Sequence, residues 1–515
     1  MRVPLTIRDF LRRAVEVFPE RVAVIDEPGV VGSLGTLTYR EFDARVRGLA
    51  SALAARGIGV GDRVGIVSPN AAKFLIAYWG VSGYGRVLVP INYRLSRDEV
   101  AYIVEHSGTS LLLVDPEFAE TFAGVGGVET IVLDGVDDAA LFAAAAADEP
   151  GPAWEPDEDA TASINYTSGT TSRPKGVELT HRNCWVNATV FGWHLGVNDR
   201  DVLMHTLPMF HANGWGMPYA ATGMGATHVV VRKIVGEEIL QRVSEHGVTL
   251  ACGAPAVWAA VLDAAAVRRD RGESVPGRDQ VRIVVAGAPP PSRTVERVET
   301  ELGWQFNQIY GLTETSPVLT VNRRPKEWDD LPMAEVAKRL AKAGTPAIGV
   351  ELRTDADGEV LARSNVVFKG YWRQPEETAA ALEGGWFHTG DGGVKAGGYL
   401  TIMDRKKDVI ISGGENVSSI EVEDVLFQHP AVAEVAVIGV PDAKWGETVK
   451  ALVVVKDGQT VSAEELREFC RERLAHYKCP TSVEFRSELP RTATGKLQKY
   501  KLRQPYWEGF ERQVN

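Results

Sequence analysis

The stretch Ala162-Ser-Ile-Asn-Tyr-Thr-Ser-Gly-Thr-Thr-Ser-Arg-Pro-Lys-Gly-Val177 joins a short apolar strand pattern to a turn rich in hydroxyl groups. Apolar and polar residues alternate from Ala162 to Asn165, which is typical of a strand that is buried on one face. The turn supplies donors that suit a polyphosphate, namely the hydroxyls of Thr167, Ser168, Thr170 and Thr171, the backbone of Gly169 and the ammonium of Lys175. We therefore predict a phosphate-binding turn at the end of a strand.

This turn differs from the Walker phosphate loop. Lys175 is followed by Gly176 rather than by Ser or Thr, and the glycine spacing is also different. A plain surface turn is the alternative interpretation of the same residues.

Short apolar runs lie on both sides of this stretch and are separated by segments of helix length. The runs cover residues 64–67, 87–89, 111–114, 131–133, 228–231 and 283–286. Such runs are typical of parallel strands that helices cover on both faces. Thr38-Tyr-Arg-Glu41 forms a capping box that opens an amphipathic helix, and we interpret the alanine-rich residues 139–147 as a short helix. The expected fold class is α/β, with layered, largely parallel sheets in a large N-terminal domain.

The pattern changes near Asp404. Beyond it, strand patterns at 409–411, 435–438 and 451–455 are interspersed with helix patterns at 418–427 and after Ser462. We therefore expect an N-terminal domain over residues 1–404 and a small α+β C-terminal domain over residues 409–515.

Composition and charge limit the classes of binding partner and the cellular compartment that we expect for this protein. The 515 residues include 56 Lys plus Arg against 68 Asp plus Glu, which gives a net charge of −12 with the basic residues scattered. Nucleic acid is therefore not an expected partner. The cysteines, Cys184, Cys252, Cys470 and Cys479, are too dispersed for a disulfide framework or a metal pair. No apolar run approaches the roughly 20 residues that span a bilayer. A cytoplasmic protein without a membrane span is expected.

Further motifs follow the hydroxyl-rich turn in a fixed order. They are Gly287-Ala-Pro289, Asn307-Gln-Ile-Tyr-Gly-Leu-Thr-Glu-Thr315, Gly385-Trp-Phe-His-Thr-Gly-Asp391, Asp404-Arg-Lys-Lys-Asp408, Ile411-Ser-Gly-Gly-Glu-Asn416 and Pro490-Arg-Thr-Ala-Thr-Gly-Lys496. Together they resemble the adenylate-forming superfamily of acyl-CoA synthetases, peptide-synthetase adenylation domains and luciferases. One departure is Ser172, where this family usually has glycine.

The resemblance implies a nucleotide site. Gly287, Ala288 and Pro289 would contact adenine, and Tyr310 would stack on it. Asp391, placed in a tight loop after Thr-Gly, and Arg405 would bind the ribose. The remaining nucleotide-binding residues that it implies are the hydroxyl-rich turn with Lys175, and Asn307, Gln308, Gly311 and Thr313.

The resemblance also assigns the reacting groups. Thr167 and Glu314 would hold Mg²⁺ against the ATP phosphates. Lys496 would stabilise the negative charge that develops at the α-phosphate. The small domain would rotate on a hinge at residues 405–408, centred on Lys407. It would then present Ser412, Gly413 and Gly414 to CoA.

Within Pro208-Met-Phe-His-Ala-Asn-Gly-Trp-Gly216, the residues from His211 to Trp215 resemble the segment of bacterial medium- and long-chain fatty acyl-CoA synthetases in which a tryptophan gates the acyl tunnel. His211, Gly214 and Trp215 would border the acid, and His211 would also lie at the catalytic centre. Packing in the core is the alternative for His211 and Trp215. Amino-acid adenylating domains have Asp where this chain has His211, so an amino acid is not expected. The size of the acid stays open.

The implied reaction is an AMP-forming acyl-CoA ligation. A carboxylic acid and MgATP would give acyl-AMP and pyrophosphate, and CoA would displace AMP. The expected cofactors and co-substrates are ATP, Mg²⁺ and CoA. The alternatives are a ligase that loads a separate carrier protein and a luciferase-like oxygenase. The oligomeric state is open, with a homodimer among the alternatives.

Overall fold

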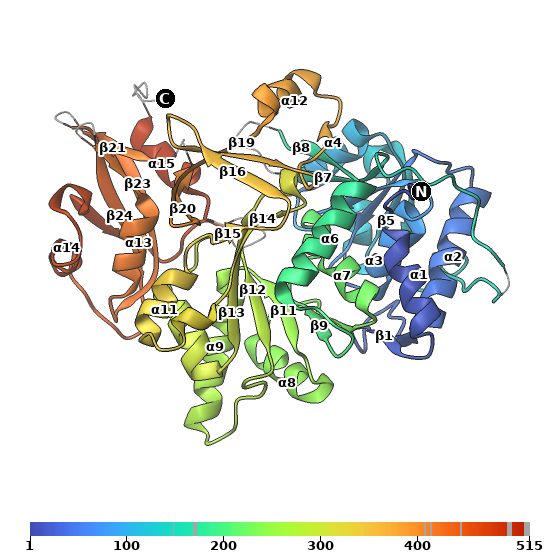
Figure 1. Cartoon of the computed structure of the whole chain (residues 1–515), viewed down its shortest axis with the longest axis horizontal. Helices are drawn as coiled ribbons and strands as arrows, with labels where there is room; N and C mark the ends of the chain where they lie inside the picture. The colour runs from blue at the N-terminus through green and yellow to red at the C-terminus, as the bar shows by residue number, and fades with distance from the viewer. Residues whose placement is uncertain are drawn as a thin grey trace.

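The computed structural model describes residues 1–147, 149–167, 173–405, 408–412, 415–442, 445–491 and 497–508, with Asp404, Arg405 and Asn416 as backbone only. The expected α/β class is confirmed. Two largely parallel sheets, here named A and B, form the large N-terminal part with their helices, and a smaller α+β unit follows (Figure 1).

Sheet A is parallel in its centre and antiparallel at both edges. Its strand order is β15 (Thr345–Pro346), β14 (Val318–Asn322), β13 (Gln305–Gly311), β12 (Arg282–Val285), β11 (Leu250–Gly253), β9 (Val202–His205), β10 (Thr227–Val230), β1 (Val22–Ile25) and β2 (Thr36–Thr38).

Sheet B repeats this plan, with parallel strands from β7 to β6 and antiparallel strands at the β18 edge. Its order is β18 (Gly370–Tyr371), β8 (Lys175–Thr180), β7 (Thr161–Thr167), β4 (Val87–Ile91), β3 (Arg63–Val67), β5 (Thr109–Val114) and β6 (Glu129–Val132).

Helices fill the space between the two sheets and cover their outer faces. The inner layer is α1 (Arg8–Val17), α2 (Tyr39–Ala55), α3 (Ala72–Ala77), α6 (His181–Leu195) and α7 (Met217–Met224). The outer face of sheet A is covered by α8 (Gly236–His246), α9 (Pro255–Asp270), α10 (Ser292–Arg297) and α11 (Met333–Leu340). The outer face of sheet B is covered by α4 (Arg97–Ser107) and α5 (Ala119–Phe122). Strand β5 shows why both faces are apolar, because Leu111 and Leu113 pack inward and Leu112 packs outward.

A third sheet, C, is antiparallel throughout and was not among the elements predicted from the sequence. Its order is β16 (Val350–Thr354), β17 (Glu359–Ser364), β19 (Phe387–Ala396) and β20 (Tyr399–Arg405), and α12 (Pro375–Ala381) precedes β19. In Figure 1 sheet C lies above sheet A, beside the smaller unit.

The C-terminal unit has its own sheet, D. It consists of β22 (Glu415–Val417), β21 (Ile410–Ser412), β24 (Gly446–Val455), β23 (Val432–Asp442) and β25 (Ser482–Phe485). One face packs on α13 (Ser419–Phe427) and α14 (Ala463–Arg471), and the other on α15 (Lys499–Trp507). Ser418 and Ser462 cap α13 and α14, as hydroxyl side chains commonly do at helix starts.

Residues 139–147 do not form the predicted helix; they form turns and irregular backbone. The segment lies against α2, where the Ala145 N–H donates to the Ala44 carbonyl at 2.9 Å. The Arg45 guanidinium donates to the Phe142 carbonyl and the Arg47 guanidinium to the Ala146 carbonyl, each at 2.8 Å. Contacts with α2 thus override the intrinsic helix preference of alanine.

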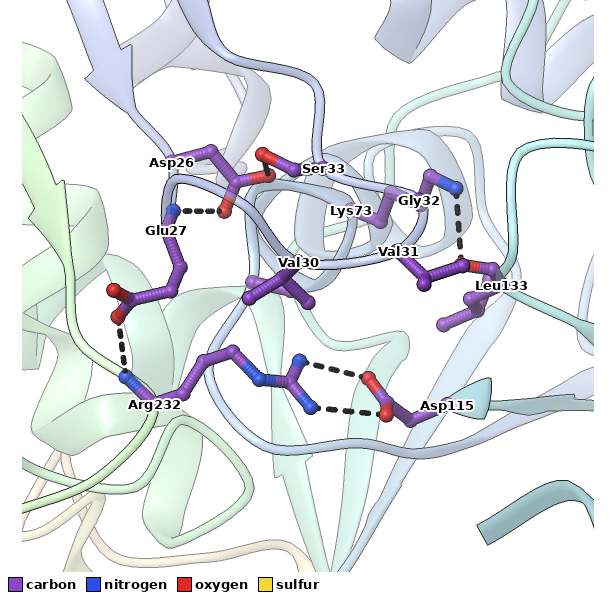
Figure 2. A pocket seen from close by; sticks show the side chains of 11 residues that line it. Asp26, Glu27, Val30, Val31, Gly32, Ser33, Lys73, Asp115, Leu133 and Arg232 are labelled. Atoms are coloured by element: carbon purple, nitrogen blue, oxygen red, sulfur yellow. Dashed lines mark hydrogen bonds and ion pairs between the residues drawn. The ribbon is translucent and has the colours of Figure 1, made fainter. Parts of the chain in front are cut away.

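Sheets A and B meet at a cluster of charged residues (Figure 2). Arg232, just after β10, forms a bidentate pair with Asp115, just after β5, at 2.8 and 3.0 Å. Lys73 on α3 pairs with Asp138 at 2.5 Å in a buried setting. Arg232, Asp115 and Lys73 line a cavity of about 10 Å³ that has room for a water-sized group only. None of the site residues predicted from the sequence lines this cavity, so the cluster serves as a junction between the sheets.

Within the described part of the chain, no helix is both long enough and apolar enough to cross a bilayer.

Candidate active site

The two strands that flank the hydroxyl-rich turn are adjacent and antiparallel. Thr167 ends β7 and lies opposite Lys175, the first residue of β8. The turn between them, with Ser168, Gly169, Thr170 and Thr171, lies outside the described residues. The strand that precedes the turn is therefore confirmed, and the role of the turn remains a prediction.

Lys175, Tyr371 and Glu314 form a cluster beside this turn. The Lys175 Nζ lies 4.7 Å from the centre of the Tyr371 ring, and the Tyr371 hydroxyl donates to Glu314 Oε1 at 3.0 Å. Burial, and then the Glu314 carboxylate, raise the pKa of Tyr371, so this hydroxyl stays a neutral donor. The cluster places an ammonium and an oriented carboxylate at one end of sheet B, which suits MgATP phosphates.

Two elements fix the position of Glu314. It lies in the short 3-10 turn Thr313–Thr315 after β13, and its carbonyl accepts from the Phe368 N–H at 2.8 Å. Tyr371 belongs to β18, where it pairs with Val177 of β8. Within the part of the chain that the structure describes, no cluster of three or more His, Cys, Asp or Glu could hold a metal by itself. Mg²⁺ would fit here as an ion that arrives with the nucleotide and is coordinated by one protein carboxylate.

Tyr310, Asp391 and Arg405 come together from two sheets. The Tyr310 hydroxyl at the end of β13 donates to Asp391 Oδ2 at 2.8 Å. Asp391 pairs across sheet C with Arg405 of β20, whose side chain is not described. The expected tight loop at Asp391 is wrong, because this residue lies inside β19 and is 7% exposed. The antiparallel pairing with β20 begins at Asp391 and continues through Gly392 and Gly393.

The turn predicted to contact adenine lies at the carboxyl end of β12. Gly287 has φ +88° with no atom within 4 Å of the place a Cβ would take, while Ala288 and Pro289 follow it on the surface. In neighbouring β13, the Asn307 amide donates to the Ile283 carbonyl at 3.1 Å. The buried Gln308 Oε1 has no hydrogen-bond partner among the described residues. Gly311 is required by space, since a Cβ there would lie 1.6 Å from the Pro317 oxygen.

The predicted acyl segment adopts a rare backbone conformation. Ala212, Asn213, Gly214, Trp215 and Gly216 have φ values of 45°, 51°, 58°, 61° and 73°. Left-handed backbone costs a non-glycine residue about 1–2 kcal/mol, so the surroundings must hold this turn in place.

Three hydrogen bonds of the Asn187 and Asn213 side chains provide that support. The Asn187 amide donates to the Trp215 carbonyl at 3.0 Å and accepts from the Val318 N–H at 3.1 Å. The Asn213 amide donates to the Ser163 hydroxyl at 2.8 Å. Trp215 is 3% exposed and packs in the core between the sheets, whereas His211 is half-buried at the start of the turn. These hydrogen bonds therefore hold the segment as a fixed wall of the predicted acyl site, and the indole ring of Trp215 is enclosed in the core.

The C-terminal candidates are only partly described. Lys407, Gly413, Gly414 and Lys496 lie outside the described residues. Ser412 ends β21 and pairs with Glu415 and Gly446. Arg491 and Leu497, the described residues on either side of the segment with Lys496, form a β-bridge with each other.

Sequence reasoning missed Tyr371 and Asn187. Tyr371 follows Gly370 in a two-residue strand, and Asn187 lies on a buried helix, so neither has a local motif. Both act on residues far away in the chain, Glu314 and Trp215, which only the packing of the sheets brings near.

Comparison with known proteins assigns the chain to a family. The model of the AMP-binding enzyme family matches residues 11–372, and that of the AMP-binding enzyme C-terminal domain matches residues 421–496. The chain is 37% identical to 4-hydroxybutyrate–CoA ligase 2 of Metallosphaera sedula, over 96% of this chain and 93% of that protein. It is also 37% identical to the peroxisomal acetate/butyrate–CoA ligase of Arabidopsis thaliana, with the same coverage of both chains.

Solved structures agree with this assignment. The o-succinylbenzoate CoA synthetase of Bacillus subtilis, in complex with its acyl-adenylate intermediate, superposes with a TM-score of 0.81. It is 31% identical, and the match covers 96% of this chain and 97% of that chain. The motifs, the layered sheets and the two-part match agree, and the chain belongs to the AMP-binding enzyme family.

Proposed function

We propose that this AMP-forming acid–thiol ligase activates a short carboxylic acid with ATP and transfers the acyl group to CoA. The ligase class is carried by one observation, the match to acyl–CoA ligases along 96% of the chain. The cluster of Lys175, Tyr371 and Glu314 supports the use of MgATP, because it offers a cation and a carboxylate beside the predicted phosphate turn.

The short acid is the finer part of the proposal. Both ligases above are named for acids no larger than hydroxybutyrate. In this chain the indole of Trp215 is enclosed in the core and its carbonyl is held by Asn187. A wall fixed in this way supports a short acyl site rather than one that opens for a long chain.

The two half-reactions require different groups at one site. Asp391, Tyr310 and Arg405 would hold the nucleotide, Lys175 and Lys496 would neutralise its phosphates, and Mg²⁺ would bridge to Glu314 and Thr167. Residues 405–408, with Lys407, would then act as a hinge that brings Ser412, Gly413 and Gly414 to CoA. The described strands β20 and β21 lie on either side of this segment, which supports a hinge between two ordered elements.

The cysteines support a reducing compartment such as the cytosol. All four are free and buried, and burial raises the pKa of Cys184 to about 12.

Exchange of labelled pyrophosphate into ATP tests the proposal. Acetate, butyrate, 2-methylpropanoate and 4-hydroxybutyrate should each be compared with hexanoate and palmitate. We expect exchange to be fastest with an acid of two to four carbons and thioester to form with CoA alone. Thioester formed only on a holo-carrier protein would contradict the acceptor, and fastest exchange with palmitate would contradict the short acid.

A further inference from the structure

The C-terminal unit contacts the N-terminal part at the first residue of α10. Asp424, on α13, accepts from the Ser292 N–H through Oδ1 at 2.9 Å. It also accepts from the Ser292 hydroxyl, at 3.1 Å to Oδ1 and 3.2 Å to Oδ2. The residue before α10 is Pro291, which has no side chain that could cap the helix. A carboxylate of one domain thus satisfies the first helical N–H of the other.

This contact is joined to the adenine turn by a stiff segment. Ser292 follows Gly287-Ala-Pro-Pro-Pro291. Each proline fixes its φ near −65°, and consecutive prolines form an extended rod without internal hydrogen bonds. The flexible joint in this stretch is Gly287, whose φ of +88° and open surroundings leave it free to turn. A displacement of Ser292 is therefore transmitted to the place predicted for adenine.

Among the other groups at this contact between the domains, some strengthen the attraction and others repel each other. The Arg293 guanidinium donates to the Gln428 carbonyl at 3.1 Å, which adds to the attraction. Lys456 follows β24, and its ammonium donates to the Pro430 carbonyl at 2.8 Å. The charges of Arg293 and Arg297 on α10 repel it, and Asp263 on α9 is the opposing charge. Burial, followed by Arg293 and Arg297, lowers the pKa of Lys456. A few polar bonds therefore hold the contact against like-charge repulsion, as suits surfaces that separate and meet again.

We propose that Asp424 is a positioning residue that couples the adenine turn to the orientation of the C-terminal domain. It acts through Ser292 and the three prolines, and it does not touch the reacting atoms. By reciprocity, a nucleotide that moves the turn shifts the domain, and the domain shifts the affinity for nucleotide. The inference rests on the proposed alternation between two half-reactions.

The first test measures the two half-reactions separately in Asp424→Ala. Acyl-AMP formation is followed by pyrophosphate exchange, and thioester formation by adding CoA to supplied acyl-AMP. Loss of the contact lowers the population of the observed arrangement, so the ratio of the two rates should change by at least about five-fold. Glu472→Gln is the matched control, because it removes one carboxylate of the same domain, just after α14, where among the described groups Glu472 pairs only with neighbouring Arg473, at 2.7 Å.

Lys456→Glu provides a variant of opposite sign. It places a carboxylate opposite Arg293 and Arg297, replaces repulsion by attraction and favours the observed arrangement. The ratio of rates should then move in the direction opposite to that of Asp424→Ala. An equal loss in both half-reactions, or a shift in the same direction in both variants, would overturn the proposal.

A direct readout separates this inference from the proposed function. Fluorophores on cysteines introduced at exposed Val267 of α9 and Glu468 of α14 report the distance between the domains. In the wild type, AMP and ATP should change the transfer efficiency, and in Asp424→Ala this change should be lost while the melting temperature stays within a few degrees. An unchanged nucleotide response in the variant refutes the coupling. If no acid is activated by the wild type, the proposed function fails, and the distance measurement still decides the inference.

Discussion

The hydroxyl of Tyr310 donates to the carboxylate of Asp391 at 2.8 Å and so ties the end of sheet A to sheet C. The bond uses Oδ2 and orients the carboxylate at the junction where Arg405 is its cross-strand partner. In the proposed enzyme the same carboxylate would accept from the ribose hydroxyls of ATP. Tyr310 would then have a second role besides its predicted contact with adenine, as the group that holds Asp391 in place.

Asp391→Asn and Tyr310→Phe should separate these roles. A hydrogen bond to a charged group contributes about 1.5–3 kcal/mol, so Asp391→Asn should weaken ATP binding roughly ten- to hundred-fold. Tyr310→Phe keeps the ring and the carboxylate and should cost less than ten-fold. The KM for ATP in pyrophosphate exchange measures both effects, and the KM for the acid should stay constant. Equal losses for ATP and acid would contradict a ribose role for Asp391.

Glu314→Gln should raise the Mg²⁺ concentration needed for adenylation. The amide keeps the shape of the side chain but loses the charge that a hard cation requires. Tyr371→Phe is the matched control, since it removes only the hydrogen bond to Glu314 Oε1 and should shift the Mg²⁺ requirement less. Thioester formation from supplied acyl-AMP should be preserved in both. Identical Mg²⁺ titrations for wild type and Glu314→Gln would refute the assignment.

Lys496→Ala should abolish the first half-reaction and spare the second. The proposed ammonium acts only on charge that develops at the α-phosphate, and removing one such group typically lowers the rate about 10²–10³-fold. Lys499→Ala serves as the comparison, because Lys499 pairs with Glu423 at 2.8 Å within the same domain. Pyrophosphate exchange and thioester formation from acyl-AMP are measured side by side. A parallel fall in both rates in folded Lys496→Ala would exclude this role.

Much of the fold could be predicted from local sequence, and the site only in part. The capping box at Thr38 and the apolar runs in both parallel sheets gave correct elements because periodicity and burial agree there. Sheet C has antiparallel strands that carry charged residues and, in β19, several glycines. Because glycines are typical of turns, the sequence favours a loop at Asp391. Residues 139–147 are alanine-rich, yet they do not form a helix, because backbone carbonyls of this segment accept hydrogen bonds from Arg45 and Arg47 of α2. Tertiary contacts that override propensity cannot be found from one sequence.

Lys73→Met should destabilise the protein without changing the chemistry. Lys73 and Asp138 are 4% and 1% exposed in their side chains and pair at 2.5 Å. Breaking such a pair leaves a buried charge unmatched and typically costs about 3–5 kcal/mol. Lys73→Met/Asp138→Leu should recover part of this loss, because both charges are then gone. The urea midpoint measures the effect, and KM values in the surviving enzyme should match the wild type. A midpoint unchanged in the single variant would contradict this account.

A buried pair of histidines should make the protein sensitive to acid. His205 Nε2 lies 2.9 Å from His228 Nδ1, and His228 Nε2 lies 3.0 Å from the Thr222 hydroxyl. Burial lowers the pKa of His228 to about 3, and burial and His228 together lower that of His205. Both rings therefore stay neutral in the fold at pH values where the unfolded chain takes up protons.

The sign of the pH dependence follows from this difference. The unfolded histidine binds its proton near pH 6.5, and the folded His228 binds none until about pH 3. The neutral histidine pair therefore makes its full contribution to stability above about pH 6.5. As the pH drops toward 3, the free energy of unfolding falls by about 1.4 kcal/mol per pH unit for each histidine. His228→Gln can keep a hydrogen bond to Thr222 and does not titrate, so the urea midpoint should fall less steeply between pH 7 and 5. His476→Gln, on the exposed surface, should retain the wild-type slope. A slope in His228→Gln as steep as that of the wild type would show that acid acts elsewhere in the molecule.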